Sequence, residues 1–70
     1  MKVLIKIHKS KEIPERIVES DDILDTVEEV IKEIGGARNS YKVYCETIEG
    51  VCEYVIFKGS KKVAGLSKAI

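Results

Sequence analysis

A stripe of apolar residues between positions 23 and 34 constrains the fold of this chain more than any other feature. The stripe consists of Ile23, Leu24, Val27, Val30, Ile31 and Ile34. Their spacing is close to the period of an α-helix, about 3.6 residues, and charged residues fill most of the other positions. Ser20 is a suitable N-cap, and Gly35-Gly36 is a suitable stop. The pattern predicts an amphipathic helix over residues 21–35 that needs a sheet to cover its apolar side.

Two strands are predicted before this helix. Between residues 2 and 8, Val and Ile recur at every second position, which gives a strand one apolar face. Lys9-Ser10-Lys11 indicates a polar turn, and residues 13–19 the returning strand. Because Pro14 lacks a backbone donor, the second strand is expected to lie at a sheet edge or to begin after the proline.

Two further strands, over residues 41–48 and 51–58, are predicted after the helix. Both runs are rich in β-branched and aromatic side chains, and Glu49-Gly50 between them suits a two-residue hairpin turn. That turn places Cys45 opposite Tyr54 on one side of the sheet. On the other side it sets two glutamates, at positions 46 and 53, against each other. Because like charges on facing positions destabilise a strand pair, that side is expected to be solvated, or the register to be shifted by a longer loop.

The C-terminal stretch carries two competing signals. Gly59-Ser60 suits another hairpin turn that leads into a last strand over residues 62–66. Alternatively, Ser60 caps a short helix, in which Gly65 would cost about 0.5–1 kcal/mol relative to alanine. The lysines after Ser60 would also stand at the positive end of the helix dipole. The strand is therefore favoured.

These elements predict a small, two-layer α+β fold. Their order is strand, strand, helix, strand, strand, with a fifth strand at the end, and the helix packs on a mixed or antiparallel sheet. Seventy residues and 7.8 kDa suffice for a single domain over residues 1–70. Such a chain buries only about 60% of its unfolded surface, so binding to a second protein, or to itself, is favoured.

The first half of the chain resembles ubiquitin-like β-grasp proteins. The resemblance spans residues 1–35 and is carried by Met1–Ile7, Ile13, Ser20-Asp21-Asp22-Ile23, Val27 and Ile31. It implies a β-grasp-like roll, in which the first and last strands lie side by side in the centre of the sheet. The second half departs from the family, because two long strands replace its shorter segment. Ubiquitin-like modifiers end in Gly-Gly, whereas this chain ends in Ser67-Lys68-Ala69-Ile70, so the resemblance implies the fold and not conjugation.

The composition indicates a thermophilic source. The chain contains ten Lys and nine Glu but only two Arg, and Gln and Trp are absent. Lys and Glu enrichment with few amide side chains is typical of hyperthermophiles, so we expect a protein of a thermophilic archaeon or of one of its viruses. No uncharged run approaches the ~20 residues of a membrane span, and the first residues lack the pattern of a signal peptide. We expect a cytoplasmic protein that does not bind membranes.

Charge is segregated along the chain, although the net charge is zero. Residues 1–11 and residues 58–70 each carry four lysines and no acid, whereas residues 12–34 carry nine acids and two basic residues. If the first and last strands are neighbours, their lysines gather into one basic patch near His8 that could bind phosphates. The candidate nucleic-acid-binding residues are Lys2, Lys6, Lys61, Lys62 and Lys68.

A second resemblance supports nucleic-acid binding by these lysines. The run Gly59-Ser60-Lys61-Lys62-Val63-Ala64 is similar to the loop and final helix of double-stranded-RNA-binding domains, where paired lysines meet phosphates. That family places one helix first, however, whereas a strand pair precedes the helix here. The simpler interpretation is that the lysines keep sheet edges soluble and unpaired.

The two thiols, Cys45 and Cys52, lie on facing strands of the predicted hairpin. In the predicted register they are diagonal neighbours, about 7–8 Å apart at the backbone, which is beyond comfortable disulfide reach. Reduced thiols are therefore expected, with a disulfide or a metal site as the alternatives. A tetrahedral metal site would need two further ligands from His8 and carboxylates.

The sequence contains no recognisable catalytic constellation. His8 has no neighbouring acid in the sequence to orient it and no placed nucleophile beside it. Gly35-Gly36 ends a helix rather than opening one, so it does not form a phosphate-binding loop. We therefore predict a non-enzymatic protein-interaction or regulatory module, without a cofactor or metal, that binds a protein partner or forms a homodimer through the hairpin sheet. The alternative is a nucleic-acid-binding protein that uses its basic N- and C-terminal segments.

Overall fold

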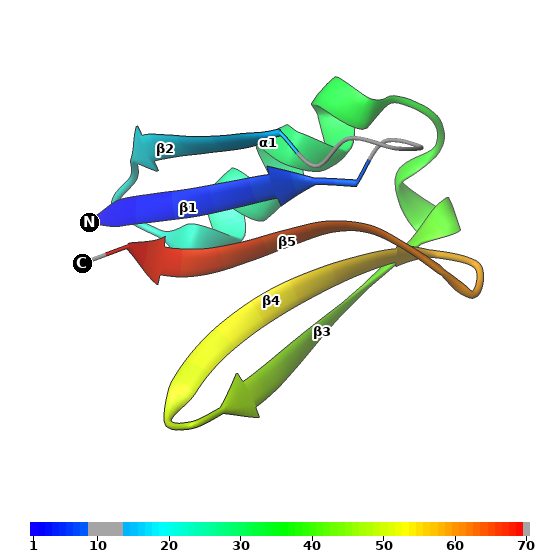
Figure 1. Cartoon of the computed structure of the whole chain (residues 1–70). Coiled ribbons are helices and arrows are strands. Elements are labelled where there is room, and N and C mark those ends of the chain that lie inside the picture. Colours follow the sequence, from blue (N-terminus) through cyan, green and yellow to red (C-terminus); the bar gives the residue numbers. More distant parts are fainter. Residues whose placement is uncertain (9–13, 70) are drawn as a thin grey trace.

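In a computed structural model, which describes residues 1–8 and 14–69, one α-helix lies against a five-stranded sheet (Figure 1). The elements are β1 (Lys2–Ile7), β2 (Glu15–Glu19), α1 (Ile23–Ile34), a 3₁₀ turn (Arg38–Ser40), β3 (Tyr41–Ile48), β4 (Val51–Lys58) and β5 (Lys61–Ala69). The predicted α+β class and order of elements are confirmed. The predicted turn at residues 9–11 lies outside the described residues.

The strands form a single antiparallel sheet in the order β2-β1-β5-β4-β3. β1 and β5, the first and last strands, are neighbours, and β5 is the central strand. The C-terminal strand is therefore confirmed and the alternative helix is wrong. β5 pairs with β4 over Lys61–Ser67 and with β1 over Ala64–Ala69, so both ladders satisfy the backbone groups in the middle of the strand.

A β-bulge interrupts the alternation of side chains along β5. Ile56 of β4 stands opposite Ala64, but the next residue, Phe57, stands opposite Lys62. Val63 is therefore the extra residue of the bulge. Consequently, even-numbered residues of β5 lie on one face of the sheet before Val63 and on the other face after it.

The boundaries of α1 agree with the predicted helix to within two residues. Asp22 is the N-cap, and its carboxylate accepts a hydrogen bond from the Leu24 N–H at 2.9 Å. The prediction of Ser20 as N-cap is wrong, because Ser20 lies two residues before the N-cap and its hydroxyl donates to the Asp22 carbonyl at 2.8 Å. At the other end Gly35 adopts a φ of 92°, and its N–H bonds to the Ile31 carbonyl at 2.9 Å.

The hydrophobic core lies between α1 and the side of the sheet that faces it. Its buried residues are Val3, Ile5, Ile7, Val27, Val30, Ile31, Tyr41, Ile56, Ala64 and Leu66. The Tyr41 hydroxyl donates a hydrogen bond to the Gly35 carbonyl, which ties the start of β3 to the end of α1. Because a core of this size is small, each of these residues accounts for a large share of the stability.

The β3–β4 hairpin has the predicted turn and register. Glu49 and Gly50 adopt φ values of 53° and 79°, the pair of positive angles that a two-residue type I′ turn requires. Cys45 is opposite Tyr54, and Glu46 is opposite Glu53. Glu46 is exposed, so the facing carboxylates lie on a solvated side of the sheet. Of the two expectations for this pair, the solvated side is confirmed and the shifted register is not found.

Candidate interaction surface

The face of the sheet opposite α1 has no helix of the described chain on it (Figure 1). Strand pairing places six large apolar side chains of the described residues on this open face: Leu4, Ile17, Tyr44, Val51, Val55 and Phe57. Three of them are largely exposed, Ile17 at 60%, Val51 at 53% and Tyr44 at 50%. Large apolar side chains on an uncovered sheet face are typical of a contact surface.

Tyr44, Val55 and Phe57 form a cluster at the β3–β4 side of the open face, here called the hairpin cluster. Tyr44 stands opposite Val55, and the rings of Tyr44 and Phe57 meet edge to face with 5.6 Å between their centroids. Val55 is 1% exposed although no helix covers it, because neighbouring side chains close over it. Aromatic residues are enriched where proteins contact one another, so this cluster is the best anchor on the open face.

An ion pair separates the hairpin cluster from Leu4 and Ile17. Lys62 Nζ lies 3.3 Å from Glu53 Oε1, and both side chains are half-buried. The pair lies over Gly65, since a Cβ atom built at Gly65 would be 2.8 Å from the Glu53 carboxylate. Glycine at this position thus provides the room for a polar bridge across the central strand.

Three of the five candidate nucleic-acid-binding lysines lie on the open face. Lys6 Nζ is 3.8 Å from Glu15 Oε1, and Lys2 stands opposite Glu19. Lys62 belongs to the ion pair described above. Each of these lysines therefore has a carboxylate beside it, so the open face carries mixed charge rather than a uniformly positive field.

The other two candidate lysines lie elsewhere. Lys68 stands opposite Val3, which is buried under α1, so Lys68 is on the helix-facing side of the sheet. Its expected place with the other lysines on the open face is wrong, because the bulge at Val63 reverses the alternation along β5. Lys61 stands opposite Lys58 beside the turn between β4 and β5.

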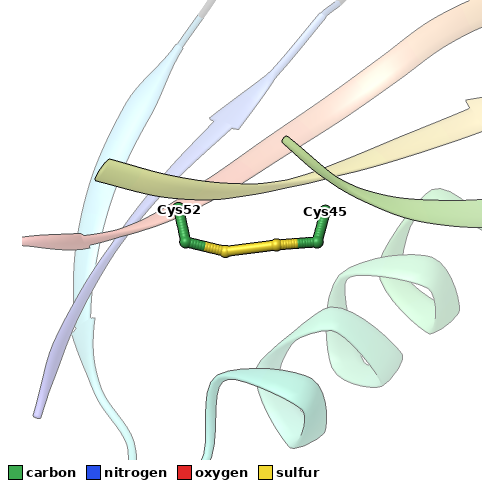
Figure 2. Close-up of a disulfide and its surroundings, with 2 residues drawn as sticks. All are labelled: Cys45 and Cys52. Atoms are coloured by element: carbon green, nitrogen blue, oxygen red, sulfur yellow. A yellow bond between two sulfur atoms is a disulfide. The ribbon is translucent and has the colours of Figure 1, made fainter. Parts of the chain in front are cut away.

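Cys45 and Cys52 form a disulfide on the helix-facing side of the hairpin (Figure 2). The expectation of reduced thiols is wrong. Their Cα atoms are 6.4 Å apart, within the range of about 4.4–6.8 Å that a disulfide spans. The right-handed twist of a hairpin draws one pair of diagonal positions together, and a flat ladder overestimates that distance. The bond ties the edge strand β3 to β4.

The remaining candidate residues do not assemble into a chemical site. Within the described residues, no group of three or more His, Cys, Asp or Glu side chains could hold a metal ion. His8 is half-buried at the end of β1, and its backbone N–H bonds to the Val63 carbonyl at 2.9 Å.

Two arginines neutralise part of the acidic side of α1. Arg38 Nε donates to both carboxylate oxygens of Glu28, at 2.8 and 3.0 Å, which lowers the pKa of Glu28 and raises that of Arg38. Arg16 of β2 makes two hydrogen bonds with Glu33, which raise the pKa of Arg16. Exposed pairs of this kind add little stability, but they join α1 to β2 and to the turn before β3.

β3 is an edge strand, and no strand of the described chain pairs with its outer side. The carbonyl of its first residue, Tyr41, accepts a hydrogen bond from Arg38 Nη1 at 3.2 Å. All eight of its residues pair with β4 in an unbroken register. On the open face it carries Lys42, Tyr44 and Glu46, all exposed. Neither Lys42 nor Glu46 takes part in an ion pair among the described residues. β3 thus presents free backbone groups, an aromatic ring and two unpaired charges of opposite sign.

No described helix is long and apolar enough to cross a membrane. Comparison of the chain with protein-family models, with curated proteins and with solved structures finds no match. The open face and the β3 edge are therefore the basis for a functional conclusion.

Proposed function

We propose that this protein is a small non-enzymatic interaction module that binds a second copy of itself through its sheet. The observation that carries the proposal is the half-exposed hairpin cluster beside an edge strand that pairs with no further strand of the described residues. Because a chain of this length has a marginal core, burial of this surface would add stability that the monomer lacks. For this surface we propose a regulatory role through binding, without catalysis.

The disulfide bears on the setting in which such a module works. Disulfides are rare in the cytosol of most cells, but intracellular proteins of hyperthermophiles contain them. The Lys- and Glu-rich composition supports the same setting. Our proposal is therefore a cytoplasmic protein of a thermophilic archaeon or of one of its viruses. The likeness to ubiquitin-like β-grasp proteins is proposed for residues 1–35 alone, where a hairpin leads into a capped helix.

Sedimentation velocity of the wild-type chain tests the proposed self-association. We expect the sedimentation coefficient to rise from that of a monomer to that of a dimer between about 10 μM and about 1 mM, the range of weak to moderate affinities. Burial of the hairpin cluster drives the association, so Tyr44→Ala is expected to shift it to higher concentration. A monomer over the whole range would contradict the proposal.

A nucleic-acid-binding role is the alternative, and it is supported by the shared face of Lys2, Lys6 and Lys62. If three lysines contact phosphates, binding to labelled DNA or RNA duplexes should weaken about 40-fold between about 50 mM and about 200 mM salt. Lys6→Glu with Lys62→Glu should abolish binding, whereas Lys68→Glu on the opposite face should not. The absence of binding at low salt, or an equal loss in the Lys68→Glu control, would exclude this role.

A further inference from the structure

We infer that β3 pairs antiparallel with β3 of a second copy about a two-fold axis at Tyr44. This pairing joins the two five-stranded sheets into one continuous sheet, and the open faces of both copies lie on the same side. The inference rests on the proposed self-association and adds the edge and the register through which it occurs.

The two edges of the sheet differ in how well they resist pairing. β2 has five residues, follows Pro14, and directs the charged Arg16 toward the helix-facing side, where it pairs with Glu33. Short length, proline and inward charge are features that protect a sheet edge from another strand. β3 has eight residues, no proline, no glycine and no bulge in its pairing with β4. β3 is therefore the edge that can accept a second strand.

Symmetry restricts the registers that β3 can adopt with its own copy. In a two-fold antiparallel pair, each residue faces the residue at the mirrored distance from the axis. Facing residues of an antiparallel pair have their side chains on the same face of the sheet, so an even-numbered residue of β3 must face an even-numbered residue of the second copy. The two-fold axis must therefore lie at one residue and not midway between two neighbouring residues. With the axis at Tyr44, Lys42 faces Glu46 of the second copy, and Glu46 faces its Lys42. The two tyrosine rings meet at the centre of the pair.

Neighbouring registers lose both of these charge pairs. An axis at Val43 sets Lys42 against the second copy's Tyr44. An axis at Cys45 sets Glu46 against that same tyrosine. A shift of two residues in either direction sets Lys42 against Lys42, or Glu46 against Glu46. Opposite charges on facing positions stabilise a strand pair, and like charges destabilise it. Charge complementarity therefore selects the register at Tyr44 from these five.

Among the described residues of the monomer, neither of these two charges has a counter-ion. Lys42 stands opposite Phe57, and Glu46 stands opposite the carboxylate of Glu53, which is already paired with Lys62. A second copy would supply an opposite charge to each. Two ion pairs flanking a central aromatic contact form an arrangement that is complementary to itself, as a two-fold interface requires.

The disulfide prepares β3 for this pairing. Cys45 is adjacent to the axis, and its bond to Cys52 holds the middle of the edge strand against β4. A strand that is already fixed loses less conformational freedom when it binds. In Figure 1 the β3–β4 hairpin extends away from α1, so the helices of the two copies do not obstruct the approach.

Charge reversal on β3 tests the register. Lys42→Glu sets carboxylates against carboxylates at both ends of the pair, and Glu46→Lys sets ammonium groups against ammonium groups. Each variant is expected to weaken dimerisation at least about tenfold in sedimentation velocity, because two attractive pairs become two repulsive ones. The double variant, Lys42→Glu with Glu46→Lys, restores opposite charges and is expected to dimerise like the wild type.

Mixing the two single variants gives a second readout. In an equimolar mixture, the carboxylates of the Lys42→Glu chain meet the ammonium groups of the Glu46→Lys chain at both pairs. We expect a heterodimer at least about tenfold tighter than either variant homodimer, measured by native mass spectrometry of chains with different isotope labels.

Two matched charge reversals outside β3 serve as controls. Lys61→Glu and Glu29→Lys change exposed residues and are expected to leave dimerisation unchanged, with folding of every variant checked by circular dichroism. A wild-type dimer that the β3 variants do not weaken, or that the controls weaken equally, would overturn the register and leave the proposed self-association standing. A wild-type chain that stays monomeric would overturn both.

Discussion

Replacing Leu66 with alanine is expected to lower the free energy of unfolding by about 3–4 kcal/mol. Leu66 is fully buried in the central strand β5, between Ile5 on β1 and Tyr54 on β4. Strands on both sides limit how far the structure can relax into the cavity. Because a chain of this length has a total stability of about 4–10 kcal/mol, this one change removes a large part of it. Denaturant unfolding followed by circular dichroism measures the loss, and Tm is expected to fall by about 15–25 °C.

Ile17→Ala is the matched control for this core substitution. Ile17 is 60% exposed on the edge strand β2, and its truncation is expected to cost about 0.5 kcal/mol or less. Equal losses for Leu66→Ala and Ile17→Ala would contradict the assignment of the core to the helix-facing side of the sheet.

Removing the disulfide, by Cys45→Ser together with Cys52→Ser, is expected to cost about 2.4 kcal/mol. The cysteines are seven residues apart in the sequence, so the bond closes a short loop of the unfolded chain and lowers its entropy. Tm is expected to fall by about 10–20 °C, measured by calorimetry.

A reducing agent provides the control for the disulfide prediction. It should lower the Tm of the wild-type chain by the same amount and leave the double serine variant unchanged. If the wild type does not respond to reduction although mass measurement shows that its thiols are free, the disulfide does not contribute to stability.

The features that could be predicted from the sequence depend on neighbouring residues. The period of α1, the stop at Gly35 and the hairpin turn at Glu49-Gly50 are set by spacing and by backbone preferences within a few positions. The register of β3 and β4 follows directly once the turn is fixed. Only the N-cap was misplaced, because Ser20 and Asp22 are both good caps and tertiary packing decides between them.

The features that were not predicted depend on the shape of the assembled sheet. A flat ladder places Cys45 and Cys52 too far apart, and only the twist of the hairpin brings them within bonding distance. Lys62 and Lys68 both occupy even positions of β5, yet they lie on opposite faces of the sheet. Nothing in the local sequence indicates that Val63 forms a bulge between them. The candidate surface on β3 likewise emerges only when β3 is known to be an edge.

The bulge at Val63 makes one position of β5 dispensable for the alternation of its side chains. Deletion of Val63 would restore a regular ladder and leave Ala64 and Leu66 on the helix-facing side, because Lys62 and Ala64 already stand opposite consecutive residues of β4, Phe57 and Ile56. Deletion of Gly65 would instead propagate along the strand, since every residue on one side of the gap would exchange faces relative to the residues on the other side. Within β5, the loss of one residue should therefore be accommodated at Val63 and not at Gly65.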